Sequence, residues 1–131
     1  MSRLTVYLAR LIGLFTLAVI AGFLLRGPSG IDATVADAPL MLCYAMIAIA
    51  LGLAIVLAHN VWSGGALPVV VTLVGWAILV KGATLLFLAP GALPSLLAQM
   101  HYGQHLLLYF LPALLLGAYL TYAGFRTKLA A

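Results

Sequence analysis

Charged residues are scarce in this sequence, and glutamate is missing altogether. Only 6% of its 131 residues are charged, with six Lys or Arg set against two Asp. A soluble domain uses about a quarter of its residues as charges to cover its surface. The composition therefore excludes a soluble domain. No catalytic motif stands out either, so we do not expect an enzyme.

Cysteine is nearly absent as well. The single thiol, Cys43, excludes an internal disulfide, a CxxC redox motif and a cysteine-based metal site. We predict no cofactor. A net charge of +4 would elsewhere suggest nucleic acid. Here the positive residues stand at the ends of apolar runs, which indicates membrane topology and contact with membrane lipids, not nucleic acid.

Long apolar runs are abundant in this sequence, and 66% of its residues are hydrophobic. Runs of about 20 apolar residues cross a hydrocarbon core of about 30 Å as helices. Four such runs, at about 4–25, 40–62, 67–89 and 104–125, occupy most of the chain. We predict a single integral membrane domain over residues 1–131. Its fold class is all-α, a four-helix transmembrane bundle running up-down-up-down.

Glycine and proline mark the connections between these spans. Residues 26–39 hold both acids of the protein and read as a polar first loop. The turn at Ser63–Gly65 is so short that the second and third spans should be antiparallel neighbours. Pro90 and Pro94 then break the chain. The stretch 95–102 forms a short interfacial helix or extends the last span outward.

The distribution of positive residues predicts the orientation. With four spans both termini share one side of the membrane, and that side carries Arg3, Arg10, Arg126 and Lys128 against Arg26 on the other. The positive-inside rule therefore places both termini in the cytoplasm of a bacterium, with the protein in the inner membrane. We read the first span as a retained anchor because the only cleavage-like stretch, at 36–38, lies far beyond its end.

Small residues recur at helical spacing in three of the spans. Ala50, Ala54 and Ala58 line one face of the second span, and Ala18 and Gly22 stand four apart in the first. Such patterns let membrane helices approach closely. They exceed what one thin bundle needs, so we expect a homo-oligomer or a subunit of a larger membrane complex.

Lys81 is the one lysine well inside an apolar run. A lysine near the middle of the bilayer costs about 2.5–3.5 kcal/mol on insertion scales. It can snorkel to the outer interface. Alternatively, Asp32, Asp37 or Tyr44 holds it in the bundle and forms a site for a proton, ion or ligand. The two aspartates also have a simpler reading as solubilising loop residues and helix caps.

His101 and His105 are spaced i, i+4, and Tyr109 follows one turn later. If one helix carries all three, the histidines share a face and could hold a metal such as Zn²⁺. Two ligands are too few, so we predict no metal site. The histidines can instead form hydrogen bonds at the membrane interface. In the functional alternative they form a polar site on the outer side together with Lys81 and the two aspartates.

His59, Asn60 and Trp62 close the second span at its cytoplasmic end. Trp62 is a natural interfacial anchor. The His and Asn side chains can bond the unpaired carbonyls of that helix end or reach Thr72 in the next span. We expect Trp76 to be a packing residue. These residues form a structural hairpin.

The same hairpin resembles small, uncharacterised four-span bacterial inner-membrane proteins. They carry HN-x-W at the end of one helix and GW-x4-KG in the next. The matching residues here are His59, Asn60, Trp62, Gly75, Trp76, Lys81 and Gly82, followed by Pro90. The resemblance covers about a quarter of the chain and implies the four-span fold without an activity.

Three functions remain open at this point. The leading hypothesis is a non-enzymatic accessory or structural subunit that associates with itself or with a larger complex. The second is a small transporter or channel with its polar site around Lys81. The third is a redox subunit that binds haem or quinone.

Overall fold

The computed structural model describes the whole chain apart from residues 90, 102 and 128–131. The described residues form five α-helices and no strand: α1 (Arg3–Ala36), α2 (Ala38–Ala58), α3 (Ala66–Phe87), α4 (Ala92–Gln99) and α5 (Leu106–Arg126). By length and composition, α1, α2, α3 and α5 are able to cross a membrane. The prediction of an all-helical fold with four long apolar helices is therefore confirmed.

The first helix is longer than predicted, and the predicted loop at 26–39 is wrong. α1 continues to Ala36 across a kink at Gly27, whose φ of 69° and ψ of −176° break the helical path. Pro28 then fits the first turn of a second helical segment, because a first-turn residue needs no N–H donor. Only Asp37 separates this segment from α2. Its carboxylate accepts a 2.9 Å hydrogen bond from the Leu40 amide, which confirms its predicted role as a helix cap.

The second and third long helices form a close antiparallel pair. Where Gly52 of α2 meets α3, an added Cβ would lie 2.6 Å from Leu79 Cα. On one side of this contact Gly75 of α3 packs on Ile55 of α2, and on the other side Gly82 of α3 packs on Ile49 of α2. This reversed order of contacts shows that α2 and α3 are antiparallel neighbours, as the short turn predicts. Within that turn Gly64 and Gly65 adopt φ values of 88° and 119°, a region that L side chains rarely enter.

The first and last long helices of the chain, α1 and α5, form the other antiparallel pair. Gly13 of α1 lies against Thr121 of α5, and Gly117 of α5 lies against Leu17. Gly124, in the last turn of α5, lies against Arg10. The order of these contacts is again antiparallel. The glycines allow the two backbones to approach closely, as small residues do in membrane helix pairs.

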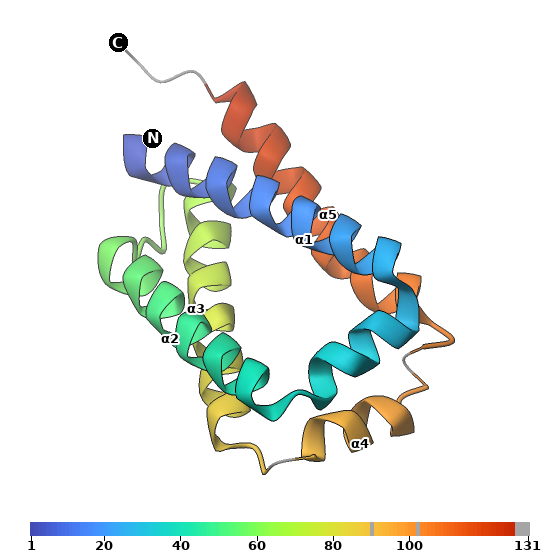
Figure 1. The fold of residues 1–131 in the computed structure, drawn as a ribbon. Helices are drawn as coiled ribbons and strands as arrows, with labels where there is room; N and C mark the ends of the chain where they lie inside the picture. Colours follow the sequence, from blue (N-terminus) through green and yellow to red (C-terminus); the bar gives the residue numbers. More distant parts are fainter. Residues whose placement is uncertain (90, 102, 128–131) are drawn as a thin grey trace.

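The two pairs meet at one end of the molecule and diverge towards the other (Figure 1). We call the meeting point the closed end: it comprises the first turns of α1, the end of α2, the start of α3 and the C-terminal half of α5. Its buried cluster contains Leu8, Ala9, Ile12, Ile55, Leu67, Val71, Val74 and Leu120. The N-terminus and the end of α5 lie on this side in Figure 1.

The opposite end, which we call the open end, consists of residues 28–36 of α1 together with α4 and the connections around it (Figure 1). α4 is a short separate helix and not an extension of α5. None of its residues is buried. Of residues 28–36 only Ile31 is buried, so the open end has much less apolar packing than the closed end.

Candidate functional site

A buried histidine joins three helices at the closed end. His59 is only 2% exposed at the end of α2. Its Nε2 lies 2.8 Å from the hydroxyl of Thr5 in α1, and its Nδ1 lies 3.2 Å from the hydroxyl of Thr72 in α3. Thr5 and Thr72 are themselves 2% and 0% exposed. Both ring nitrogens are thus occupied by side chains of neighbouring helices.

The direction of these hydrogen bonds follows from Thr72. Its hydroxyl faces the carbonyls of Val61 at 3.0 Å and His59 at 3.3 Å, which can only accept. It also accepts from the Val61 amide at 3.0 Å. Because the hydroxyl carries one proton, a Thr72 hydroxyl that donates to either carbonyl accepts from Nδ1 of His59. In a neutral imidazole Nε2 then accepts from Thr5, whose oxygen lies 2.7 Å from that of Ser2.

The hydrogen bonds of His59 connect α2 to α1 and α3, and the sequence predicted only the one to α3. The expected reach of His59 to Thr72 is confirmed. The contact with Thr5 is new, because no spacing pattern relates a residue near the N-terminus to a helix end more than fifty positions later. A His59 with both nitrogens bonded has none left to ligate a haem iron.

The aromatic residues of the hairpin lie on its outside. Trp62 donates through Nε1 to the Asn60 side chain at 2.7 Å, and it is 57% exposed. Asn60 therefore pairs with the tryptophan rather than with Thr72. Trp76 is 40% exposed on α3, so it faces the surroundings instead of filling the interior.

Lys81 lies on the exposed surface of α3. Its ammonium nitrogen lies 5.3 Å from the centre of the Tyr44 ring of α2, a cation–π contact. Of the three partners considered for it, Tyr44 is the one that the structure places against it. Asp37 caps α2 instead, and Asp32 lines a pocket at the open end.

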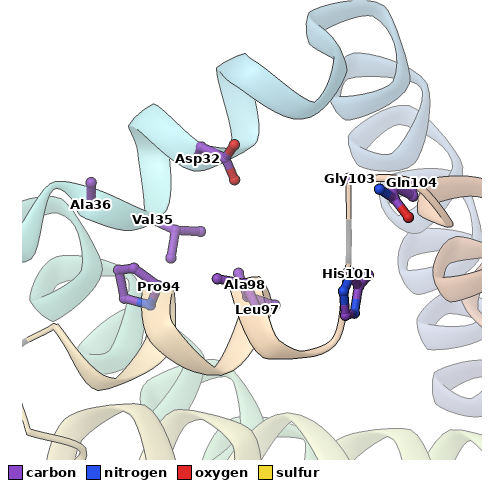
Figure 2. Close-up of a pocket in the computed structure, with 9 residues that line it drawn as sticks. All are labelled: Asp32, Val35, Ala36, Pro94, Leu97, Ala98, His101, Gly103 and Gln104. Carbon is purple, nitrogen blue, oxygen red and sulfur yellow. The ribbon is translucent and has the colours of Figure 1, made fainter.

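That pocket lies between the second segment of α1 and α4 and has a volume of about 500 Å³ (Figure 2). Asp32 enters it from α1, and His101 and Gln104 come from the chain that follows α4. The remaining lining is mainly small or apolar: Val35, Ala36, Pro94, Leu97, Ala98 and Gly103. The structure thus brings Asp32 and His101 of the predicted polar set to one pocket, without Lys81.

The two neighbouring histidines do not share a helix. His101 has a φ of 52°, and α5 begins only at Leu106, so the helix that would align His101 with His105 is not formed. His105 stands at the start of α5 and lines a second pocket of about 400 Å³ beside Pro28. Tyr109 donates its hydroxyl to the Met100 carbonyl at 2.9 Å, which ties α5 to the end of α4.

Within the described part of the chain, no group of three or more His, Cys, Asp or Glu side chains is placed to hold a metal ion. The pockets at the open end offer hydrogen-bonding groups and one carboxylate beside apolar walls. That chemistry suits a small polar or cationic ligand, since Asp32 carries the only acidic side chain that lines either pocket.

Comparison with known proteins gives no relative: no family model, no curated protein and no solved structure matches this chain.

Proposed function

We propose that this protein is a non-enzymatic, multi-pass protein of the bacterial inner membrane that serves as an accessory or structural subunit. It associates with copies of itself or with a larger membrane complex. The observation that carries the proposal is the presence of small-residue helix faces that stay exposed after the chain has folded. The resemblance of the α2–α3 hairpin to small four-span bacterial proteins remains part of the proposal.

The small residues of α2 fall on two faces. Ala48 and Gly52 are buried against α3, whereas Ala50, Ala54 and Ala58 are exposed. In α1, Ala18 is exposed, and a Cβ added at Gly22 would meet nothing within 4 Å. Helices in lipid associate through close van der Waals packing at small residues, because lipid tails are as apolar as leucine. These open faces therefore suit the helices of a second chain.

A test of association compares two alanine-to-leucine variants by native mass spectrometry of the protein in mild detergent. Ala54→Leu adds bulk to the open face of α2 and is expected to shift the protein towards the monomer. Ala118→Leu adds the same bulk to an exposed position of α5 outside the small-residue faces, and it should keep the wild-type assembly. A strictly monomeric wild type that captures no companion protein would contradict the proposal.

The proposed topology is up-down-up-down with both termini in the cytoplasm. Its support is the antiparallel order of both helix pairs and the position of the N-terminus and the end of α5 on the same side (Figure 1). Arg3, Arg10 and Arg126 belong to that side, in agreement with the positive-inside rule.

Single cysteines test this topology directly. In a Cys43→Ser background, Ser29→Cys and Ser63→Cys place a thiol at two exposed positions on opposite sides. A membrane-impermeant maleimide added to intact cells with a permeabilised outer membrane should label position 29 only. Position 63 should react only after the inner membrane is opened. The reverse pattern would invert the orientation, and labelling of both positions would rule out four spans.

A small transporter or channel is the second candidate, and the pocket at the open end favours it. The pocket combines Asp32 and His101 on the side that we assign to the cell exterior. Liposome flux of small cations tests it. Asp32→Asn and His101→Gln should abolish transport if the pocket is the site, whereas a loss in Lys81→Met would transfer the site to α3. Absence of any flux in the wild type removes this candidate.

A further inference from the structure

We propose that the closed end holds a binding site for the phosphate of an anionic phospholipid, centred on Arg10. The inference rests on the proposed membrane location and adds a specific ligand to it. The site lies where Arg10 of α1 meets the last turn of α5.

Arg10 is held rigidly in a half-buried position. Its Nε donates a 2.9 Å hydrogen bond to the carbonyl of Gly124, and its guanidinium carbon lies 4.8 Å from the centre of the Phe125 ring. Gly124 belongs to the last turn of α5, where carbonyls lack a donor from their own helix. The guanidinium therefore caps α5 and at the same time stacks on its aromatic side chain.

One edge of this guanidinium remains available to a ligand. The guanidinium has five N–H donors, and the one on Nε is used by Gly124. The four on the two terminal nitrogens form no hydrogen bond within the described residues. A planar fork of such donors matches two oxygens of a phosphate. Because the side chain is already fixed by Gly124 and Phe125, an anion that binds it loses little further side-chain freedom.

No carboxylate side chain is available to neutralise this charge. The only acids of the chain are Asp32 and Asp37. Both follow the kink at Gly27 and belong to the opposite end of the molecule (Figure 1). The closed end instead carries two further arginines, Arg3 and Arg126, and among its described side chains there is no carboxylate.

The surroundings of Arg10 match the level of lipid headgroups. Arg126 lies 5.6 Å from the centre of the Tyr122 ring and donates to its hydroxyl, and Tyr122 and Phe125 are both exposed. Aromatic side chains with basic neighbours are typical of the boundary between hydrocarbon and headgroups. The phosphate that reaches Arg10 there belongs to a lipid of the cytoplasmic leaflet, and the excess positive charge favours a headgroup with net negative charge.

Native mass spectrometry of protein released from nanodiscs tests the proposal. The probes are phosphatidylglycerol and phosphatidylcholine in equal amounts. The wild type should retain phosphatidylglycerol preferentially, and Arg10→Gln should reduce that preference about tenfold or more, because the charge-assisted hydrogen bonds from its guanidinium to the phosphate are lost. Arg26→Gln is the matched control: it removes an exposed arginine at the kink of α1, towards the open end, and should leave the preference unchanged.

Two further measurements keep the test decisive. If Arg10→Gln unfolds because α5 loses its cap, Arg3→Gln and Arg126→Gln keep the cap and should each lower the preference. Inorganic phosphate should give no thermal stabilisation at concentrations where phosphatidylglycerol does; equal stabilisation by both would overturn a lipid source. Equal retention of the two lipids, or an equal loss in Arg26→Gln, would overturn the site while leaving the proposed membrane function intact.

Discussion

The closed end and the open end of this molecule are built in different ways. At the closed end, α1, α2, α3 and α5 share a buried apolar cluster, and His59 bonds to threonines on two other helices. At the open end, α4 buries no residue and faces α1 across a pocket. Water drives apolar groups together, but lipid does not, so helices in a membrane are joined where small residues and hydrogen bonds permit. The hydrogen bonds of His59 lie at the closed end, whereas the close glycine contacts between α2 and α3 continue beyond it.

The difference predicts that stability depends mainly on the closed end. Thr72→Val should have the largest effect, because it leaves the buried Nδ1 of His59 and the part-buried Val61 amide without their partner. We expect a loss of about 3 kcal/mol in the free energy of unfolding, since each unsatisfied buried group costs about 1–3 kcal/mol. Thermal unfolding in detergent measures it.

Thr84→Val is the matched control for this loss. Thr84 is exposed on α3 and bonds only within its own helix, to the Val80 carbonyl at 2.8 Å. The Thr84→Val variant should therefore unfold at the same temperature as the wild type. Equal losses in both variants would mean that the His59 contacts contribute nothing specific, and the contrast between the two ends would fail.

A glycine pair tests packing in the same way. A Cβ at Gly75 would lie 2.5 Å from Cγ2 of Ile55, a buried member of the closed-end cluster. Gly75→Ala should therefore destabilise the protein by about 2 kcal/mol through overpacking. Gly22→Ala meets nothing within 4 Å inside a helix and should be neutral or slightly stabilising, because alanine favours the helix more than glycine does. Chemical denaturation in mixed micelles compares the two, and a neutral Gly75→Ala would show that α2 and α3 pack more loosely than described.

The kink in α1 allows a test of the open end, for comparison with the closed end. Gly27 has room for a methyl group but adopts a φ of 69° and a ψ of −176°, which is essentially a glycine conformation. Gly27→Ala should cost about 1–2 kcal/mol of backbone strain. Proteolysis of the open end should increase while the closed end stays protected. Gly103→Ala, whose Cβ would make an ordinary 3.4 Å contact with Pro28, should change neither.

The smallest expected effect concerns the start of α2. Asp37→Ala removes the acceptor for the Leu40 amide, and a lost helix cap costs about 0.5–1 kcal/mol at an exposed site. Asp37→Asn keeps an oxygen acceptor and should retain most of the stability. Thermal unfolding of the two variants decides; an equal loss in Asp37→Asn and Asp37→Ala would indicate that the charge, and not the cap, matters.

Patterns that are local in the chain predicted their structures well. The four apolar runs became four long helices, the turn around Ser63–Gly65 made α2 and α3 antiparallel, and Asp37 caps α2. The polar composition of residues 26–39 was misleading. It reads as a loop, but Gly27 absorbs the break and Pro28 starts a new helical segment, so a polar stretch of low hydropathy is helical to Ala36.

Contacts between distant residues were beyond prediction from the sequence. In the sequence Arg10 is only one of the positive residues that indicate the orientation, whereas it caps a helix more than a hundred residues later. His101 and His105 read as one helical pair, whereas His101 itself adopts a left-handed φ of 52° and α5 begins only at Leu106. In each case the deciding contact depends on how two helices are placed, which no spacing within either helix contains.

By itself the sequence determined that this chain forms helices long enough to cross a membrane, because apolar length and the need to satisfy backbone hydrogen bonds leave no other choice in lipid. The tertiary structure alone decided which ends of those helices meet. Apolar faces are interchangeable when lipid is the solvent. Glycines that admit a neighbouring backbone, and a histidine with partners on two helices, distinguish one arrangement from the others.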